Sequence, residues 1–264
     1  MESTGEGGGG GGALGFTEIE TTAEALGRDE IAHIVKEILG FVLYMHRQIP
    51  SVLQNLEKEF DALKEEHKEE EEEMVVGSEE LRGAWRRKQN WRKREVKRGI
   101  KRLGKLMNSV SSLISGFREA IDRVPEIQSV ALVLGGSVLR PRCVYELEVS
   151  SVGFDSCGPR DSSKTKLAQA LSRKAIRALI SNGAGSSSYL GPTKLYLMVK
   201  CSSTFNLPMH FLPKRDFKYP KKVVPFKLHI KCKTSSIDCD QNEIIWFQCK
   251  HAIKGIPCNV PPEG

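Results

Sequence analysis

The chain has 264 residues and a formal net charge of +7, enough length for one large domain or two small ones. It contains seven cysteines but no C-x-x-C pair, and its first residues lack a charged-then-apolar signal segment. These features favour a reduced intracellular compartment over a secreted, disulfide-bonded scaffold. No apolar run approaches the roughly 18 residues that span a bilayer, so we expect no membrane insertion.

Order is predicted to begin at Asp29. Residues 1–27 contain the unbroken glycines Gly7–Gly12 and no periodic apolar pattern, which is typical of a disordered tail. From Asp29, which can cap a helix, apolar residues recur at three- and four-residue spacing in one continuous stripe. Pro50 marks the end of this helix, and a weaker amphipathic helix follows over Ser51–Leu63.

Residues 64–95 are predicted to be a charged insertion whose sign reverses part-way. Glutamates dominate its first half, and like charges at this density indicate an extended, solvated linker. Twelve arginines and lysines then crowd into residues 82–105. Three interpretations stay open: the solvated face of a helix, a nuclear-import signal, or a nucleic-acid-contacting helix with Trp85 and Trp91 available to stack. The import candidates are Arg86, Arg87, Lys88, Arg92, Lys93 and Arg94.

A long central helix is predicted over Glu79–Val124. Its apolar residues follow alternating four- and three-residue steps from Val96 to Ile121, a seam that could pack within the chain or form a coiled-coil dimer. Packing within the chain is favoured, because Pro125 ends the helix and the buried strand Val130–Leu134 follows at once. We therefore expect the free protein to be a monomer.

The later elements predict an α+β fold, with a mainly antiparallel central sheet backed by helices. Residues 202–222 hold three prolines among basic residues and are expected to be a functional loop, while residues 257–264 are expected to be a flexible C-terminus. The expected elements after Val130–Leu134 are the strand Cys143–Val149, the helix from Leu167 to its stop at Asn182-Gly183, and the strands Lys194–Cys201, Phe226–Cys232 and Ile244–Cys249.

The helix from Leu167 carries two apolar stripes. One consists of leucines and alanines, and the second runs through Ala168, Ser172, Ile176 and Ile180. A helix with two such stripes is either enclosed in a core or offers one stripe to a partner. The pattern alone favours the core.

No arrangement of residues indicates catalysis. Cys249 and His251 point to one strand face without a second ligand pair, so buried thiols are favoured over a zinc site. Gly135-Gly136-Ser137 lacks the flanks of a phosphate loop and of a nucleophile elbow. We expect neither enzymatic activity nor a cofactor.

Several short motifs occur in one order along the chain and together resemble the comet family of HORMA-domain proteins. They are L-Y-M-H-R-Q-I-P at Leu43–Pro50, V-L-G-G-S-V-L-R-P followed by V-Y-E-L-E-V-S, F-L-P-K at Phe211–Lys214, I-I-W-F-Q at Ile244–Gln248, and K-G at Lys254-Gly255. The resemblance covers about Ile31 to Ile256. It implies a HORMA domain over residues 28–256, with a C-terminal seat-belt region at Ile244–Gln248.

The resemblance also implies a function, that of a non-enzymatic adaptor. Such an adaptor binds the closed form of the spindle-checkpoint protein MAD-two and presents it to a hexameric AAA+ remodelling ATPase, which opens MAD-two and silences the checkpoint. The polyglycine start and the charged insertion are compatible with a plant-type member, for which meiotic HORMA proteins in synapsis and recombination are a second client. The implied location is the nucleus, and the cytoplasm during mitosis.

By the same resemblance, Ile176 lies where the family places an apolar residue that inserts into MAD-two, which reverses the preference for the core at that position. Met45 lies at a first-helix contact, and Ile180 and Ser172 share the stripe of Ile176. Pro213 and Lys214 lie in the segment that the ATPase recognises. The family has an aromatic residue where this chain has Ile176, and a smaller anchor weakens such a contact.

The alternative function is that of a nuclear nucleic-acid- or chromatin-binding protein acting through residues 82–105. The salt dependence of the binding affinity distinguishes the two functions. Phosphate-dominated binding falls steeply as salt rises, whereas binding through an apolar surface depends on salt much less.

Overall fold

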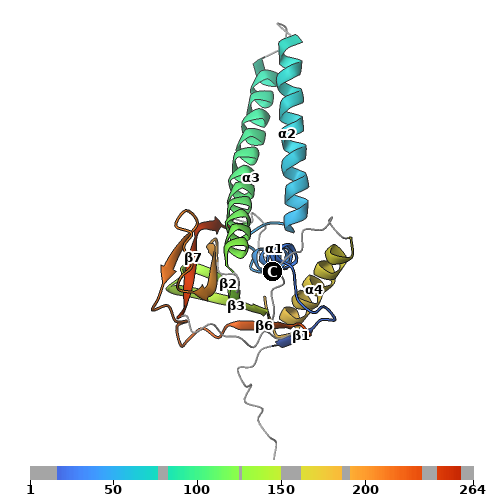
Figure 1. Cartoon of the computed structure of the whole chain (residues 1–264). Helices are drawn as coiled ribbons and strands as arrows, with labels where there is room; N and C mark the ends of the chain where they lie inside the picture. The colour runs from blue at the N-terminus through green and yellow to red at the C-terminus, as the bar shows by residue number, and fades with distance from the viewer. Residues whose placement is uncertain are drawn as a thin grey trace, which may run out of the picture.

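A seven-stranded sheet with helices packed on one face forms the domain (Figure 1). The computed structural model describes residues 17–76, 83–124, 127–149, 162–185, 191–233 and 243–256. The helices are α1 Arg28–Met45, α2 Leu53–Val76, α3 Gly83–Arg123 and α4 Ser162–Ser181. The strands are β1 Thr17–Glu20, β2 Ile127–Ser137, β3 Arg140–Val149, β4 Lys194–Ser202, β5 Phe211–Lys214, β6 Phe226–Lys231 and β7 Ile244–Lys254.

The strand order is β1-β6-β3-β2-β4-β7-β5. The strand β6 runs parallel to its two neighbours β1 and β3, and the other four pairings are antiparallel. The predicted α+β class with a mostly antiparallel sheet is therefore confirmed. The strands expected around Val130, Cys143 and Leu195 are confirmed as β2, β3 and β4, and each extends beyond its predicted bounds.

The two faces of the sheet are covered differently. One face packs its alternating side chains, such as Leu132 and Leu197, against buried residues of α1, α3 and α4. The other face carries Val144 and Trp246, which the segment between β5 and β6 covers with Phe217. Residues 202–222, expected to be a loop, thus contain the edge strand β5 and part of the hydrophobic core. The aromatic side chains of this segment, such as Phe211 and Phe217, therefore contribute to the packing of the domain.

Helices α2 and α3 form a long antiparallel hairpin that projects from the domain (Figure 1). The extended linker expected from residue 64 is wrong as far as Val76, because α2 continues through the acidic run. Glutamate is a good helix former, and the basic α3 lies alongside to offset the repulsion, with Glu66 and Arg92 2.9 Å apart. Phe60 packs against Gly104, which places the α3 seam against α2 within one chain.

The N-terminal region differs from its prediction. Residues 17–20 form β1, and Ile19 is buried, so the expected disorder is wrong for residues 17–27; the rest of the tail and residues 257–264 lie outside the described residues. The cap of α1 is Gly27, not Asp29. The backbone N–H of Gly27 donates to the Glu30 carboxylate at 2.6 Å, one half of a capping box.

The stop of α4 is confirmed. Gly183 has a φ of +80°, in the left-handed region that glycine adopts freely. The backbone N–H of Ala184 donates to the Leu179 carbonyl at 2.9 Å, which satisfies one of the last helical acceptors.

Gln48, which is 0% exposed, links three parts of the chain. Its amide nitrogen donates to the carbonyls of His46 at 2.8 Å and Gly191 at 2.9 Å, and its amide oxygen accepts from the Thr193 N–H at 2.7 Å. Its backbone carbonyl accepts from the N–H of Ile256 at 2.7 Å. Gln48 therefore joins the end of α1 to the start of β4 through its side chain and to the segment after β7 through its backbone.

The position of Gly255 depends on this amide. A Cβ added at Gly255 would collide with the Gln48 side-chain oxygen, so only glycine allows the chain to pass there. Two of the motifs found in the sequence, H-R-Q-I-P and K-G, are thus two halves of one contact.

Replacing Gln48 by Ala should lower the free energy of unfolding by about 2–4 kcal/mol. The variant leaves the buried His46 carbonyl and the half-buried Gly191 carbonyl and Thr193 N–H without their partner, and a group left unpaired costs about 1–3 kcal/mol when it is fully buried. Urea denaturation of the full chain measures the change. The matched control is Gln169→Ala on the exposed face of α4, which should change the stability by less than about 0.5 kcal/mol. Equal stability of the two variants would contradict the role given to Gln48.

Candidate functional site

A hollow of about 270 Å³ lies between α1, the start of α2 and α4. Its apolar lining comes from Phe41 and Tyr44 of α1, Val52 before α2, and Ile176 of α4. Tyr44 and Val52 are each 43% exposed, an unusual amount for large apolar side chains that lie together. Ile180, one turn beyond Ile176 on α4, is 51% exposed.

The second stripe of α4 changes from core to surface along the helix. Ala168 and Ser172 are buried, Ile176 is half-buried and Ile180 is exposed. The Ser172 hydroxyl donates to the Ala168 carbonyl at 2.8 Å. Ser172, predicted from the resemblance to touch a partner, is only 3% exposed and has no free polar group to offer. The surface part of the stripe is therefore its C-terminal half.

Met45 is half-buried beneath the turn that ends α4. Gly185 has a φ of +85°, and a Cβ added there would lie 2.5 Å from the Met45 methyl carbon. The two residues therefore fit only because one is glycine. Met45 thus contacts the turn after α4, and only part of its side chain is accessible.

Cations border the exposed part of α4. Arg173, Lys174 and Arg177 are exposed, and on the other side of the hollow Lys36 and Glu57 form an ion pair at 3.2 Å. Apolar side chains at the centre with charges at the border are the arrangement of protein–protein interfaces.

A second surface lies at the β5 end of the sheet. Phe211 is buried and anchors the strand, Pro213 is exposed and Lys214 is half-buried. Within the described part of the chain β5 pairs only with β7, where Pro213 lies opposite Phe247. Pro213 and Lys214 thus lie on an edge strand. The two residues predicted to contact the ATPase are close together and accessible.

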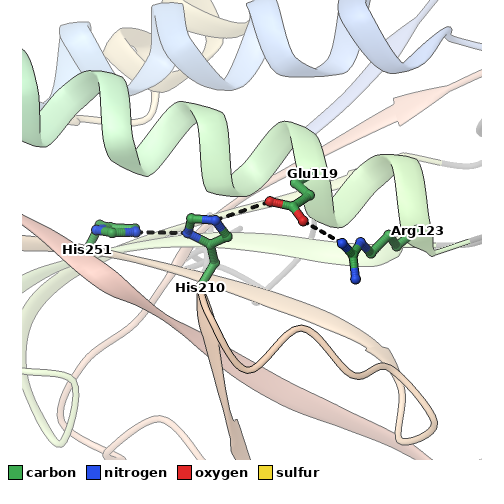
Figure 2. Close-up of polar contacts among 4 residues, drawn as sticks. All are labelled: Glu119, Arg123, His210 and His251. Carbon is green, nitrogen blue, oxygen red and sulfur yellow. Dashed lines mark hydrogen bonds and ion pairs between the residues drawn. The ribbon is translucent and has the colours of Figure 1, made fainter.

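A chain of polar contacts holds β5 against α3 (Figure 2). His210 places Nδ1 2.9 Å from Nε2 of His251, and its Nε2 lies 3.1 Å from the carboxylate of Glu119. The same carboxylate accepts from Arg123 at 2.7 Å. The contacts join β7, the residue before β5, and α3. They fix the strand that carries Pro213 relative to the helical layer.

Two histidines are held in their neutral form by the fold. Burial lowers the pKa of His46, whose Nε2 lies 2.6 Å from the Tyr145 hydroxyl. Burial also lowers the pKa of His251, and the positive charges of His210 and Lys250 add to the effect. The folded state therefore binds fewer protons at these sites than the unfolded chain does.

The free energy of unfolding should fall as the pH drops below about 6.5. The stability due to neutral His46 and His251 is fully present above the unfolded pKa of 6.5 and is lost as the pH falls toward the lower folded values. Urea denaturation between about pH 7.5 and 5.5 measures the slope. A protein with both histidines replaced by Gln should show a flatter profile. An identical slope in both proteins would contradict the assignment.

The basic run lies on α3. Arg92 pairs with Glu66 across the hairpin, and Lys93 and Arg94 follow on the same continuous helix. The side chains of the other import candidates, Arg86, Arg87 and Lys88, lie outside the described residues. The import assignment stays a prediction.

Two of the described cysteines, Cys201 and Cys249, are buried thiols. Burial raises the pKa of Cys201 to about 12 and that of Cys249 to about 11, which opposes formation of a reactive thiolate. In the described ranges, no group of three His, Cys, Asp or Glu side chains is placed to hold a metal ion. None of the described helices is long and apolar enough to cross a membrane.

A family model described as "p31comet: Mad1 and Cdc20-bound-Mad2 binding" matches residues 23–257. The chain belongs to the p31comet family. The matched range contains α1 to α4 and β2 to β7, and therefore both of the surfaces described above. Comparison with individual curated proteins gives no match. Membership confirms the comet resemblance and makes the chain a Mad2-binding adaptor of checkpoint silencing, Mad2 being the MAD-two protein named above.

Several residues of the two surfaces were missed by the sequence analysis. Tyr44 and Val52 lie at the end of one predicted helix and before the next, where nothing in the spacing indicates that they stay exposed. The network of His210 and His251 joins residues 41 positions apart, which no local pattern can indicate. The exposure of Ile180 agrees with the partner role that the resemblance implied for it, whereas the stripe pattern alone had favoured the core.

Proposed function

We propose that this protein binds the closed form of Mad2 through the α1–α4 surface and recruits a hexameric AAA+ ATPase through the β5 edge. The ATPase then opens Mad2, and the spindle checkpoint is silenced. The protein itself performs no catalysis in this scheme. The observation that carries the proposal is the hollow between α1 and α4, with the exposed Ile180 beside it.

The shape of this surface favours a folded protein as its partner. Tyr44 and Ile180 project from it, and the hollow lined by Val52 and Ile176 can receive side chains in return. Burying an isoleucine or leucine side chain completely contributes about 1.5–3 kcal/mol, and Ile180 still has half of its area to bury. Ile176 is smaller than the aromatic residue of the family, so the neighbouring Tyr44 supplies the large rigid side chain that such contacts favour.

The two surfaces lie at opposite ends of the sheet. The helix α4 packs against β1 and β6 at one end, and β5 is the last strand at the other. An adaptor must hold its client and its ATPase at the same time, which requires surfaces that do not overlap. The strand order supplies that separation.

Meiotic HORMA proteins are a proposed second client, because a surface that recognises one closed HORMA fold is suited to related ones. We place the protein in the nucleus, and in the cytoplasm during mitosis, with the helical run from Arg86 to Arg94 as the import signal. The basic composition of that run supports this location.

Ile180→Arg and Ile176→Arg should each weaken Mad2 binding by at least about 30-fold, because a charge would be buried without a partner at the centre of the interface. Isothermal titration with purified Mad2 in its closed form measures the loss. The matched control is Ile244→Arg, which changes an exposed isoleucine at the other end of the sheet and should bind normally. Full affinity in folded Ile180→Arg protein would disprove this surface.

Replacing Pro213 and Lys214 together by Ala should weaken ATPase binding about tenfold or more and leave Mad2 affinity unchanged, because both residues lie at an edge far from α4. Pull-down with the purified ATPase, with and without Mad2, measures both properties. The chain offers a matched control in Pro220 and Lys221, a second Pro-Lys pair in the same segment. If both double variants lost the ATPase equally, the β5 edge would not be its specific site.

A further inference from the structure

The outer face of α3 carries a row of cations that the adaptor function does not use. At 100° per residue, five side chains fall within an arc of about 100° on the side opposite the seam that packs against α2. All five are exposed. They are Arg94, Arg98, Lys101, Arg102 and Lys105, defined here as the α3 basic face.

The charges of this face are available to a ligand. Arg98 lies 3.3 Å from Glu95, an ion pair whose side chains are both largely exposed and which therefore binds weakly. The other four cations form no ion pair within the part of the chain that the structure describes. Arg92, which points toward the hairpin interface, is the cation that pairs with Glu66 of α2. The acidic helix thus neutralises the inner side of α3 and leaves the outer side positive.

The acidic α2 does not cancel this field. Packed helices lie about 8–10 Å apart axis to axis, so the acids of α2 are separated from the outer side of α3 by the width of a helix. The screening length at physiological salt is about 8 Å. A polyanion at the α3 basic face therefore experiences mainly the cations.

The arrangement fits a regular phosphate backbone better than a folded acidic protein. The face extends over about 16 Å of straight helix between Arg94 and Lys105, on a hairpin that projects from the domain (Figure 1). Three of its five cations are arginines, whose planar donors match phosphate oxygens. Trp91, 65% exposed one turn before Arg94, can stack on an unpaired base.

We propose that the α3 basic face binds nucleic acid through the phosphate backbone, without reading its sequence. The proposal is independent of Mad2 binding, because the face lies on the projecting hairpin and shares no residue with the α1–α4 surface. It gives the adaptor a second attachment, to nucleic acid.

The test uses the full chain and a fluorescent DNA of about 25 base pairs, with fluorescence anisotropy as the readout. Five phosphate contacts give a slope of about −4.5 in log affinity against log salt, so affinity should fall about 500-fold between roughly 50 and 200 mM. Replacing Arg94, Lys101 and Lys105 by Gln should reduce this fall to about 12-fold. The control replaces Lys218, Lys221 and Lys222 by Gln, which removes the same charge elsewhere and should leave the slope unchanged.

Two further arms decide between ligands. Trp91→Ala should weaken binding of a single strand of the same length more than binding of the duplex. Polyglutamate should compete poorly with DNA at equal charge. Equal competition by polyglutamate would overturn the proposal in favour of an acidic protein partner, and equal slopes in the α3 variant and its control would overturn it altogether. Mad2 titration of the α3 variant should be normal, which shows that the protein is folded.

Discussion

The contacts of Gln48 hold three parts of the domain together. Its side-chain amide ties the end of α1 to the start of β4, and its backbone carbonyl binds the N–H of Ile256, just after β7. The end of α1 carries Tyr44 and Met45, and β7 holds the edge strand β5. A change at Gln48 would therefore affect the end of α1, the start of β4 and the segment that follows β7.

The helix α3 connects the remaining parts. Its C-terminal half buries Phe117 and Ile121 against the sheet, and Glu119 on the same half receives His210. Its N-terminal half leaves the domain beside α2 and exposes cations instead of apolar residues. One helix thus belongs to the core at its C-terminal end and projects from the domain at its N-terminal end. Its apolar seam continues along both halves, while the composition of its outer face changes.

The sequence analysis succeeded where one local period determines the structure. The seam of α3 and the glycine stop of α4 are set by residues three and four positions apart, and both are confirmed. It failed at α2. Like charges favour an extended chain only when no opposite charges lie beside them, and here Arg92 of α3 lies beside Glu66 of α2. It missed β1, whose four residues give too short an alternation to recognise. Half-exposed side chains such as Tyr44 depend on which elements meet, so their role follows only from the packing.

The way β5 is anchored bears on the proposed ATPase contact. An adaptor that presents a client to a remodelling enzyme must keep its own fold while the client loses its fold. The segment that the enzyme binds should therefore be held by more than one strand pairing. The strand β5 pairs with β7, buries Phe211 and is joined through His210 to Glu119 of α3. Pulling on Pro213 would have to break a strand pairing, a hydrophobic anchor and a polar chain together. These three contacts are suited to a strand that stays folded while the ATPase binds it, and not to a segment that the ATPase unfolds.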